Sequence, residues 1–401
     1  MYTQQINAST VTAILPEAYV QHTLDALQQA GHNVVRWHAR GTLKDNRWYR
    51  SLFPAISPEK GVIRVLVPNT DIDKVMQIIV EKGNLDRQGT GAVFSVPCDE
   101  IHIGGHFNTS CKANDIADQV GITAMKENLD IIQCIVEKSQ TEQISNAAIA
   151  AGAHGPIVHY CEGRGLRDRL GWLRITKQPE KEVLTVIVEN ADADNVFHAM
   201  ANAGDLDLPG HGFMYQMPVN KGLFNLPSHF DAHRHNANMQ QVIGAIDHLM
   251  GHDDWRDQSV FEIGGSGKTA GLGFLKKARQ QRILEEQVSL TAMVDRDHAE
   301  QLMDMMLDNG APGLNTSYCQ RITTDTESIH DNVNLVHEYG ILSCIVDNDT
   351  AHDILAQVKI QAEQAGIENL CLYLQPIPKV ITYIHHPQVE KRRNANELKS
   401  A

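Results

Sequence analysis

Residues 61–97 read GVIRVLVPNTDIDKVMQIIVEKGNLDRQGTGAVFSVP, an apolar strand, a polar turn, an amphipathic helix, a glycine-containing loop and a second apolar strand. Two later stretches repeat this pattern, EVLTVIVENADADNVFHAMANAGDLDLPGHGFMYQMP at 182–218 and YGILSCIVDNDTAHDILAQVKIQAEQAGIENLCLYLQP at 339–376. Internal repeats of this kind define the folding unit. We therefore expect three copies of one strand–helix–strand unit.

Each copy is preceded by a second segment of the same type, at 10–35, 130–161 and 288–319. The helical stretches carry apolar residues at helix spacing, as at Ile72, Val75 and Ile79. Right-handed crossovers within each half place both helices on one side of a four-stranded antiparallel sheet. The predicted fold class is α+β, with three ferredoxin-like (βαββαβ) domains whose bare sheet faces pack together as an intramolecular pseudo-trimer.

The repeats predict the domain organisation. The first domain is expected at 1–118, the second at 119–226 and the third, with degenerate loops and a polar tail, at 286–401. Residues 227–285 are too long for a plain linker. Within them MQQVIGAIDHLM has helical periodicity, so we predict a helical insertion.

Composition limits the classes of partner. The chain has 401 residues, a formal net charge of −14 and a pI of about 5.8. Bulk attraction to nucleic acid or to an anionic membrane is therefore not expected. No apolar run approaches the ~18 residues that a membrane span needs. Seven cysteines without a CxxC pair are typical of a reducing compartment, so a cytoplasmic location is expected.

The second repeat carries GAHGPIVHYCEGRGLRDRLG at 152–171, PEKEVLTVIV at 179–188 and GDLDLPGHGFMY at 204–215. In order and spacing these motifs resemble the T-loop base, third strand and B-loop of the nitrogen regulatory P-II and P-II-like signalling proteins. The resemblance implies three tandem P-II-like domains in one chain. In that family nucleotides bind in clefts between neighbouring subunits.

The resemblance implies an effector site made of glycine-rich loops and a few cations. Its residues in the second repeat are Gly163, Gly165, Arg167, Lys181, Gly210 and Gly212. Those in the first repeat are Arg40, Gly41, Lys60, Gly89 and Gly91. Such glycines can present backbone N–H groups to a phosphate. At the position of the P-II B-loop lysine this chain has Phe213 and Ala92, which argues against tight triphosphate binding.

The resemblance implies a signal-transduction protein without catalytic activity. It would bind a small anionic effector, such as ATP, ADP or AMP, and regulate a target enzyme or transporter through its long loops, in nitrogen metabolism. No cofactor is required, and the particle is expected to be a monomer or a dimer of pseudo-trimers. The alternative is a structural scaffold related to CutA or ACT domains that binds no nucleotide.

Two further motifs contain residue types that can bind phosphate or a metal ion. GGSGKT at 264–269 has Glu262 where a P-loop needs its first glycine, so a P-loop is not predicted. His229, His233 and His235 are weak candidates for a metal site, and an enzyme built on them is the third hypothesis. No cysteine or second dense cluster joins them, so surface histidines are the preferred interpretation.

Overall fold

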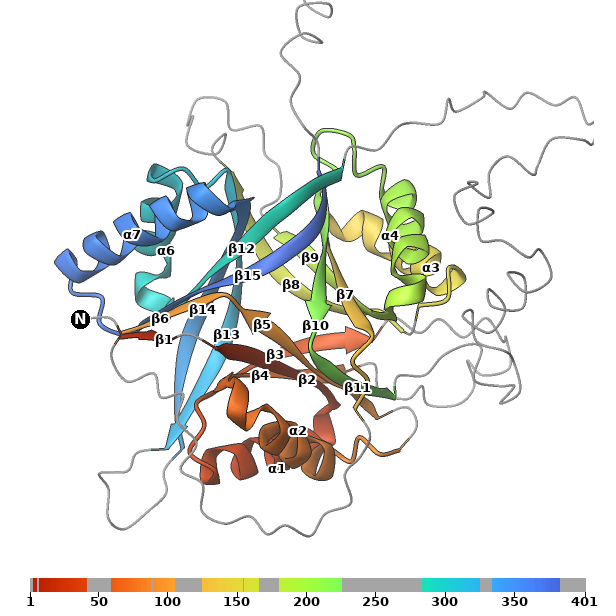
Figure 1. Ribbon diagram of the computed structural model, residues 1–401, viewed down its shortest axis with the longest axis horizontal. Helices are drawn as coiled ribbons and strands as arrows, with labels where there is room; N and C mark the ends of the chain where they lie inside the picture. The colour runs from red at the N-terminus through yellow and green to blue at the C-terminus, as the bar shows by residue number, and fades with distance from the viewer. Residues whose placement is uncertain are drawn as a thin grey trace, which may run out of the picture.

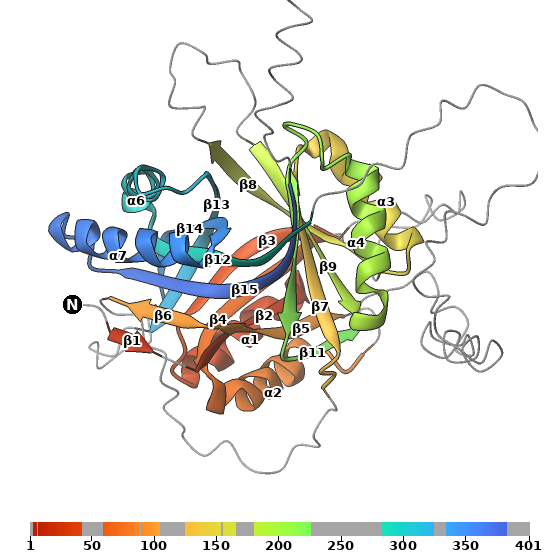
Figure 2. The ribbon, with the colours of Figure 1, turned by 45° about the horizontal axis from the view of Figure 1, so that its top comes forward.

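The computed structural model of the protein describes residues 3–5, 7–41, 59–87, 90–104, 125–153, 155–165, 180–225, 283–324 and 334–382. Three pairs of helices lie on the outside of a central body of strands (Figure 1). Turning the molecule leaves the same arrangement, with strands from all three repeats converging at the centre (Figure 2). None of the helices in the described ranges is long and apolar enough to span a membrane.

Each repeat contributes four long strands and two helices. The first repeat contains β2 (Ala8–Pro16), α1 (Glu17–Gln29), β3 (Val34–Gly41), β4 (Glu59–Pro68), the short helix η2 (Asn69–Asp71), α2 (Ile72–Gly83) and β5 (Gly91–Cys98). The second contains β7 (Leu129–Val136), α3 (Lys138–Ala150), β8 (Ile157–Gly165), β9 (Glu180–Glu189), α4 (Asn190–Gly204) and β10 (Phe213–Val219). The third contains β12 (Ile283–Asp295), α6 (Arg296–Asp308), β13 (Gly313–Thr324), β14 (Asn334–Asp347), α7 (Asn348–Gln364) and β15 (Leu370–Thr382). Three short strands complete the set, β1 (Thr3–Gln5), β6 (Glu100–Ile103) and β11 (Lys221–Asn225).

The helices form where the sequence predicts them because one face of each is apolar. In α2 the predicted residues Ile72, Val75 and Ile79 are all buried against the sheet. In α7 the N-terminus is also capped, since the Asp347 carboxylate accepts a hydrogen bond from the Thr350 backbone N–H at 2.9 Å. The strand–helix–strand segments predicted from the repeats are therefore present.

The strands of different repeats hydrogen-bond to one another. The second strands meet in pairs: β3 with β8, β8 with β13, and β13 with β3. The segment after each fourth strand also crosses to a neighbour, so that β6 pairs with β15, β11 pairs with β5, and the end of β15 pairs with β10. All pairs are antiparallel, and together they make one 15-stranded sheet.

The prediction of three ferredoxin-like (βαββαβ) P-II-like domains forming an intramolecular pseudo-trimer is wrong. A ring of nine strands, in the order β10-β7-β9-β8-β3-β13-β14-β12-β15, closes into an antiparallel barrel that dominates the fold. The physical reason lies at the strand edges, where unpaired N–H and C=O groups of one repeat are satisfied by the next. This fold gives no support to a P-II assignment or to nitrogen regulation. The predicted domain boundaries stay a prediction.

The core has an inner part and three outer parts. The inner cluster combines residues of all three repeats, for example Trp37, Tyr215 and Tyr373. Each outer cluster lies between the sheet and the helix pair of a single repeat. The interior of the barrel is therefore the place where the three repeats meet.

Candidate functional site

The strand register defines corresponding positions in the three repeats. Arg64 in β4 pairs with Thr12, Thr185 in β9 with Gln133, and Ser343 in β14 with Thr291. Arg64, Thr185 and Ser343 therefore occupy the same place in the first, second and third repeats. By the same register Trp37, His159 and Ser317 correspond to one another on β3, β8 and β13.

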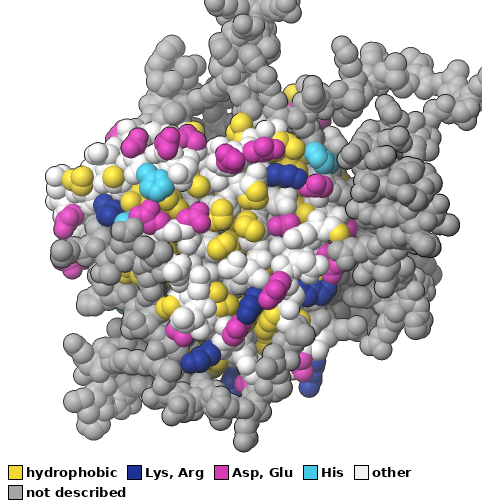
Figure 3. All heavy atoms as spheres, viewed as in Figure 1, with side chains coloured by type: hydrophobic (Ala, Val, Ile, Leu, Met, Phe, Trp, Pro, Cys, Tyr) yellow, Lys and Arg dark blue, Asp and Glu magenta, His cyan; other side chains and the backbone are white. Residues whose placement is uncertain are grey.

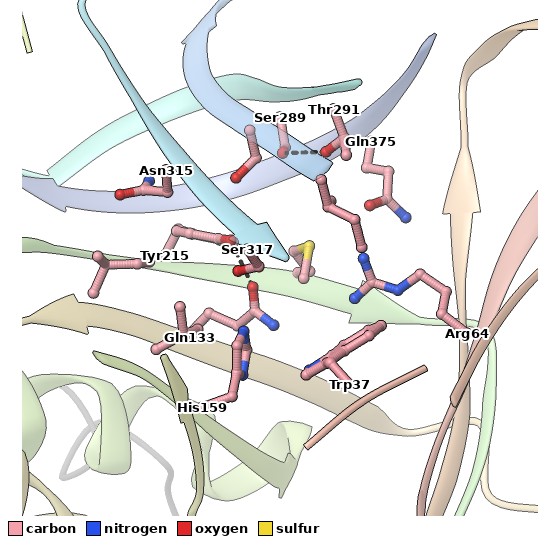
Figure 4. Close-up of a pocket in the computed structure, with 15 residues that line it drawn as sticks. Trp37, Arg64, Gln133, His159, Tyr215, Ser289, Thr291, Asn315, Ser317 and Gln375 are labelled. Atoms are coloured by element: carbon pink, nitrogen blue, oxygen red, sulfur yellow. Dashed lines mark hydrogen bonds between the residues drawn. The ribbon is translucent and has the colours of Figure 1, made fainter. Parts of the chain in front are cut away.

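All of these positions except Thr185 line a cavity inside the barrel (Figure 4). The cavity volume is about 60 Å³, which is room for about four water molecules. The first repeat contributes Trp37 and Arg64 to its lining. The second contributes Gln133, Ile135, His159, Val183, Tyr215 and Met217. The third contributes Ser289, Thr291, Asn315, Ser317, Ile341, Ser343 and Gln375.

Among the lining residues that the structure describes, Arg64 is the one with a permanent charge. Its Nε donates a hydrogen bond to Thr12 Oγ1 at 3.2 Å, and one Nη donates to the Tyr373 hydroxyl at 3.4 Å. Its guanidinium carbon lies 5.1 Å from the centre of the Trp37 ring, a cation–π contact. Within the ranges that the structure describes, Arg64 forms no ion pair. A positive charge therefore faces the cavity without a carboxylate partner.

The other titratable groups around the cavity are neutral at pH 7. Burial, reinforced by Arg64, lowers the pKa of His159 to about 3. Burial also raises the pKa of Tyr373 to about 12 and that of Tyr215 further still, against an opposing effect of Arg64 in both cases. The net charge of the lining is therefore +1.

Several hydrogen-bond donors of the lining have no protein acceptor. The buried indole N–H of Trp37 has none among the described residues. Asn315, Ser317 and Ser343 are half-buried, and none forms a side-chain hydrogen bond within the described ranges. The Tyr215 hydroxyl, in contrast, donates to Gln133 Oε1 at 2.5 Å. A cation surrounded by free donors is suited to bind an anion.

The lining residues do not form a catalytic set. Their one histidine lies 5.8 Å, ring centre to ring centre, from Trp37, and no carboxylate among them orients it. The serine hydroxyls lack the adjacent base that nucleophilic catalysis requires. The arrangement is suited to binding a ligand.

The predicted effector residue Arg40 lies at the junction of the first and second repeats. Its Nη2 donates to both oxygens of Glu182, at 2.9 and 3.0 Å, and Glu182 is only 1% exposed. Gly41 pairs with Ile157 of β8 at the same junction. The structure thus brings Arg40 and Gly41 to the boundary between repeats, where the charge of Arg40 is balanced by a carboxylate.

The described glycines of the predicted loops have a backbone role. Gly91 has φ +146° and Gly212 has φ +99°. A Cβ atom on Gly91 would lie 1.9 Å from the Ile14 carbonyl oxygen, and one on Gly212 would lie 2.1 Å from that of Ile135. Gly210 also has positive φ, at 84°. Gly91 and Gly212 let the fourth strand approach the first, which accounts for them without a ligand.

The two predicted lysines differ in their surroundings. Lys181 forms an ion pair of 3.1 Å with Glu137, whereas Pro16 stands opposite Lys60 in the corresponding strand pair. Burial lowers the pKa of Lys60.

The two predicted glycines of β8 also lie at contacts within the sheet. Gly163 lies against the Lys181 side chain, and Gly165 pairs with Gly313 of β13.

Some sequence candidates lie outside the described residues. These are Gly89, Arg167, His229, His233 and His235, together with the helix predicted within 227–285. Among the residues that are described, no group of three or more His, Cys, Asp or Glu side chains is placed to hold a metal. The effector site predicted from the loops stays a prediction.

The sequence analysis missed Arg64. The available signal was a lone arginine within the apolar run GVIRVLV, whose counterparts in the other repeats are Thr185 and Ser343. A charge in a strand that is otherwise buried indicates a paired or functional group. Its meaning becomes clear only when the neighbouring strands are known.

Comparison with known proteins does not identify a family. No protein-family model and no curated protein matches the chain. Among solved structures, a microcompartment protein from Desulfitobacterium hafniense DCB matches at 9% identity and a TM-score of 0.16, over 66% of this chain and 98% of that one. The ligand-free regulatory subunit of aspartate kinase from Thermus thermophilus matches at 9% identity and a TM-score of 0.17, over 50% of this chain and 95% of that one. Similarity at this level carries no functional argument.

Proposed function

We propose that this protein is a non-catalytic binding protein for a small monoanion, which it holds in the central cavity of the barrel. The observation that carries the proposal is the Arg64 guanidinium, which faces the cavity without a carboxylate partner among the described residues. An unpaired cation inside a protein costs free energy, because the charge loses water. A bound anion offsets this cost.

Charge matching sets the valence of the ligand. The lining carries one positive charge and no negative one, since His159, Tyr215 and Tyr373 are neutral. A monoanion balances that charge, whereas a dianion would bring a second buried charge without a partner. The cavity of about 60 Å³ is also far smaller than the roughly 300 Å³ or more of typical pockets for larger ligands.

A regulatory role fits the position of the cavity. Trp37 and His159 line it on β3 and β8. The sequence analysis expects a long loop after each of these strands and assigns contact with a target protein to such loops. A ligand that contacts both strands would favour one arrangement of their ends, and so could alter binding of the target.

A second candidate site has one observation in its favour. The Tyr160 ring is 55% exposed at the junction of the first and second repeats. The Arg40 guanidinium carbon lies 5.8 Å from its centre and Lys138 Nζ lies 5.9 Å from it. An exposed aromatic ring close to Lys138, and to Arg40 in its ion pair with Glu182, could stack on the base of an adenine nucleotide while Lys138 binds a phosphate.

Titration calorimetry on the full chain separates these possibilities. Formate, acetate, nitrate and AMP would be titrated into the wild type, Arg64→Met and Arg164→Met, a control that removes a cation paired with Glu300 on the outside. We expect acetate or formate binding that Arg64→Met abolishes and Arg164→Met preserves. Equal affinity in the wild type and Arg64→Met would overturn the cavity proposal. Absence of binding for every ligand would favour a scaffold role.

A further inference from the structure

The walls of the central cavity differ in chemistry from repeat to repeat. The wall from the third repeat is polar apart from Ile341, with Ser289, Thr291, Asn315, Ser317, Ser343 and Gln375. The wall from the second repeat is mixed, since Ile135, Val183 and Met217 are apolar and the other three residues are polar, namely Gln133, His159 and Tyr215. The first repeat adds the cation and the indole. A ligand that fills this cavity therefore meets a positive charge, a hydrogen-bonding side and an apolar side.

The polar wall has groups available for a ligand. Ser317, Ser343 and Asn315 make no side-chain hydrogen bond within the described ranges. The hydroxyls of Ser289 and Thr291 lie 3.4 Å apart, at the long end of the hydrogen-bonding range. Figure 4 shows Ser289, Thr291 and Ser317 beside the space between the strands. Hydroxyl groups donate and accept, so this wall can bind either a hydroxyl or a carbonyl oxygen.

The cavity walls differ because the three repeats carry different residues at corresponding positions. Arg64, Thr185 and Ser343 are corresponding residues, and so are Trp37, His159 and Ser317. Three identical chains around such a cavity would present three copies of each group. Here the position in the first repeat carries a cation, Arg64, and the corresponding position in the third repeat carries a hydroxyl group, Ser343. This arrangement suits a ligand without three-fold symmetry.

From these walls we infer that the ligand is a short 2-hydroxy- or 2-oxo-carboxylate, an inference that rests on the proposed function. The carboxylate pairs with Arg64, the adjacent oxygen binds the hydroxyl and amide groups of the third repeat, and the short alkyl part contacts the apolar wall. Nitrate lacks an apolar part, and propionate lacks the hydroxyl or carbonyl oxygen on carbon 2. A cavity of about 60 Å³ limits the ligand to a few heavy atoms.

The matched pair of L-lactate and propionate tests the inference, because the two differ by one hydroxyl group. Lactate, pyruvate, propionate and nitrate would be titrated calorimetrically into the full chain. One added hydrogen bond predicts that lactate or pyruvate binds about tenfold more tightly than propionate. Ser343→Ala should reduce this preference, because it removes one hydroxyl group of the polar wall. The control is Thr185→Ala, at the corresponding position in the second repeat, where Thr185 accepts a hydrogen bond from Gln133 at 3.3 Å.

The outcomes distinguish this inference from the proposed function. Arg64-dependent binding of all monoanions with equal affinity would overturn the inference and leave the proposed function standing. A lactate preference that survives both Ser343→Ala and Ser317→Ala would also overturn it. If neither these four ligands nor formate or acetate bind, both fail together. The ligand series on the wild type decides the preference even if a variant does not fold.

Discussion

The Arg64 guanidinium lies over the Trp37 ring, with 5.1 Å between the guanidinium carbon and the ring centre. Both residues come from the first repeat, on the paired strands β3 and β4, and both line the cavity. The contact fixes a cation in the interior of the barrel beside residues of the second and third repeats. It places one charge where the three repeats meet.

Replacing Arg64 should cost little stability when the ligand is absent. Because the cation lacks a carboxylate partner among the described residues, Arg64→Met removes an unfavourable desolvation term along with two hydrogen bonds to neutral hydroxyls. We expect the free energy of unfolding in urea to change by no more than about 1 kcal/mol. Saturating anion should then stabilise the wild type and leave the variant unchanged. A loss of several kcal/mol without ligand would show that Arg64 is structural.

The ion pair between Arg40 and Glu182 should stabilise the junction of the first and second repeats. Glu182 is buried and Arg40 is 41% exposed, so Arg40→Met leaves a carboxylate inside the protein without its partner. We expect a loss of about 2 kcal/mol in the free energy of unfolding, with partial recovery in the double variant with Glu182→Ala. The exposed pair Arg164–Glu300 is the control and should be worth less than about 1 kcal/mol. Equal effects for the two pairs would contradict this account.

Gly91 and Gly212 should be required for stability. Alanine at either position would combine positive φ with a Cβ atom about 2 Å from a carbonyl oxygen. We expect Gly212→Ala to lower the free energy of unfolding by about 3 kcal/mol. The control Gly366→Ala has φ +71° and no atom within 4 Å, so it should cost about 1 kcal/mol. Similar unfolding free energies for the two variants would show that the close approach does not matter.

The stability should fall as the pH is lowered through the acidic range. Burial lowers the pKa of His159 to about 3 from its usual 6.5. Between these pH values the histidine is protonated in the unfolded chain but not in the folded chain, and this favours unfolding. The free energy of unfolding is therefore not reduced by His159 above about pH 6.5, and it falls progressively as the pH is lowered towards 3. The His159→Asn variant should show a smaller slope in unfolding free energy between pH 4 and 6, by up to about 1.4 kcal/mol per pH unit. An unchanged slope would mean that His159 titrates normally.

Local structure could be predicted from the sequence because it depends on spacing. The apolar stripe of Ile72, Val75 and Ile79 correctly indicates α2, and the repeats correctly indicate the order of strands and helices. The assembly could not be predicted in this way. The pairing of β3 with β8 and β13 is made by backbone N–H and C=O groups. Nearly every residue carries these groups, so the sequence does not indicate which strands pair.

The candidate site shows the same limit. The glycine motifs suggested an anion site, yet Gly91 and Gly212 serve the approach of two strands. Arg64 can be identified in the sequence as a lone charge. Its hydrogen-bond partner Tyr373, and Thr291, which lines the same cavity, are each more than two hundred residues away along the chain. The register of the sheet decides which of these distant residues line the same cavity. A single repeat, read by itself, does not contain it.

Surface charge offers no competing site on the face seen in Figure 3. Acidic, basic and hydrophobic side chains are interspersed over its coloured part, without a broad region of one sign. A surface with both signs of charge gives little guidance for a charged partner. The interior of the barrel is the more specific environment.

A crystal structure of the full chain grown with sodium bromide tests the central claim most directly, because bromide is a monoanion that anomalous scattering locates without ambiguity. We expect an anomalous peak inside the barrel within hydrogen-bonding distance of the Arg64 guanidinium, and no peak there in crystals of Arg64→Met. A cavity that holds only water in the wild type, with Arg64 paired to a carboxylate of its own chain, would contradict the account.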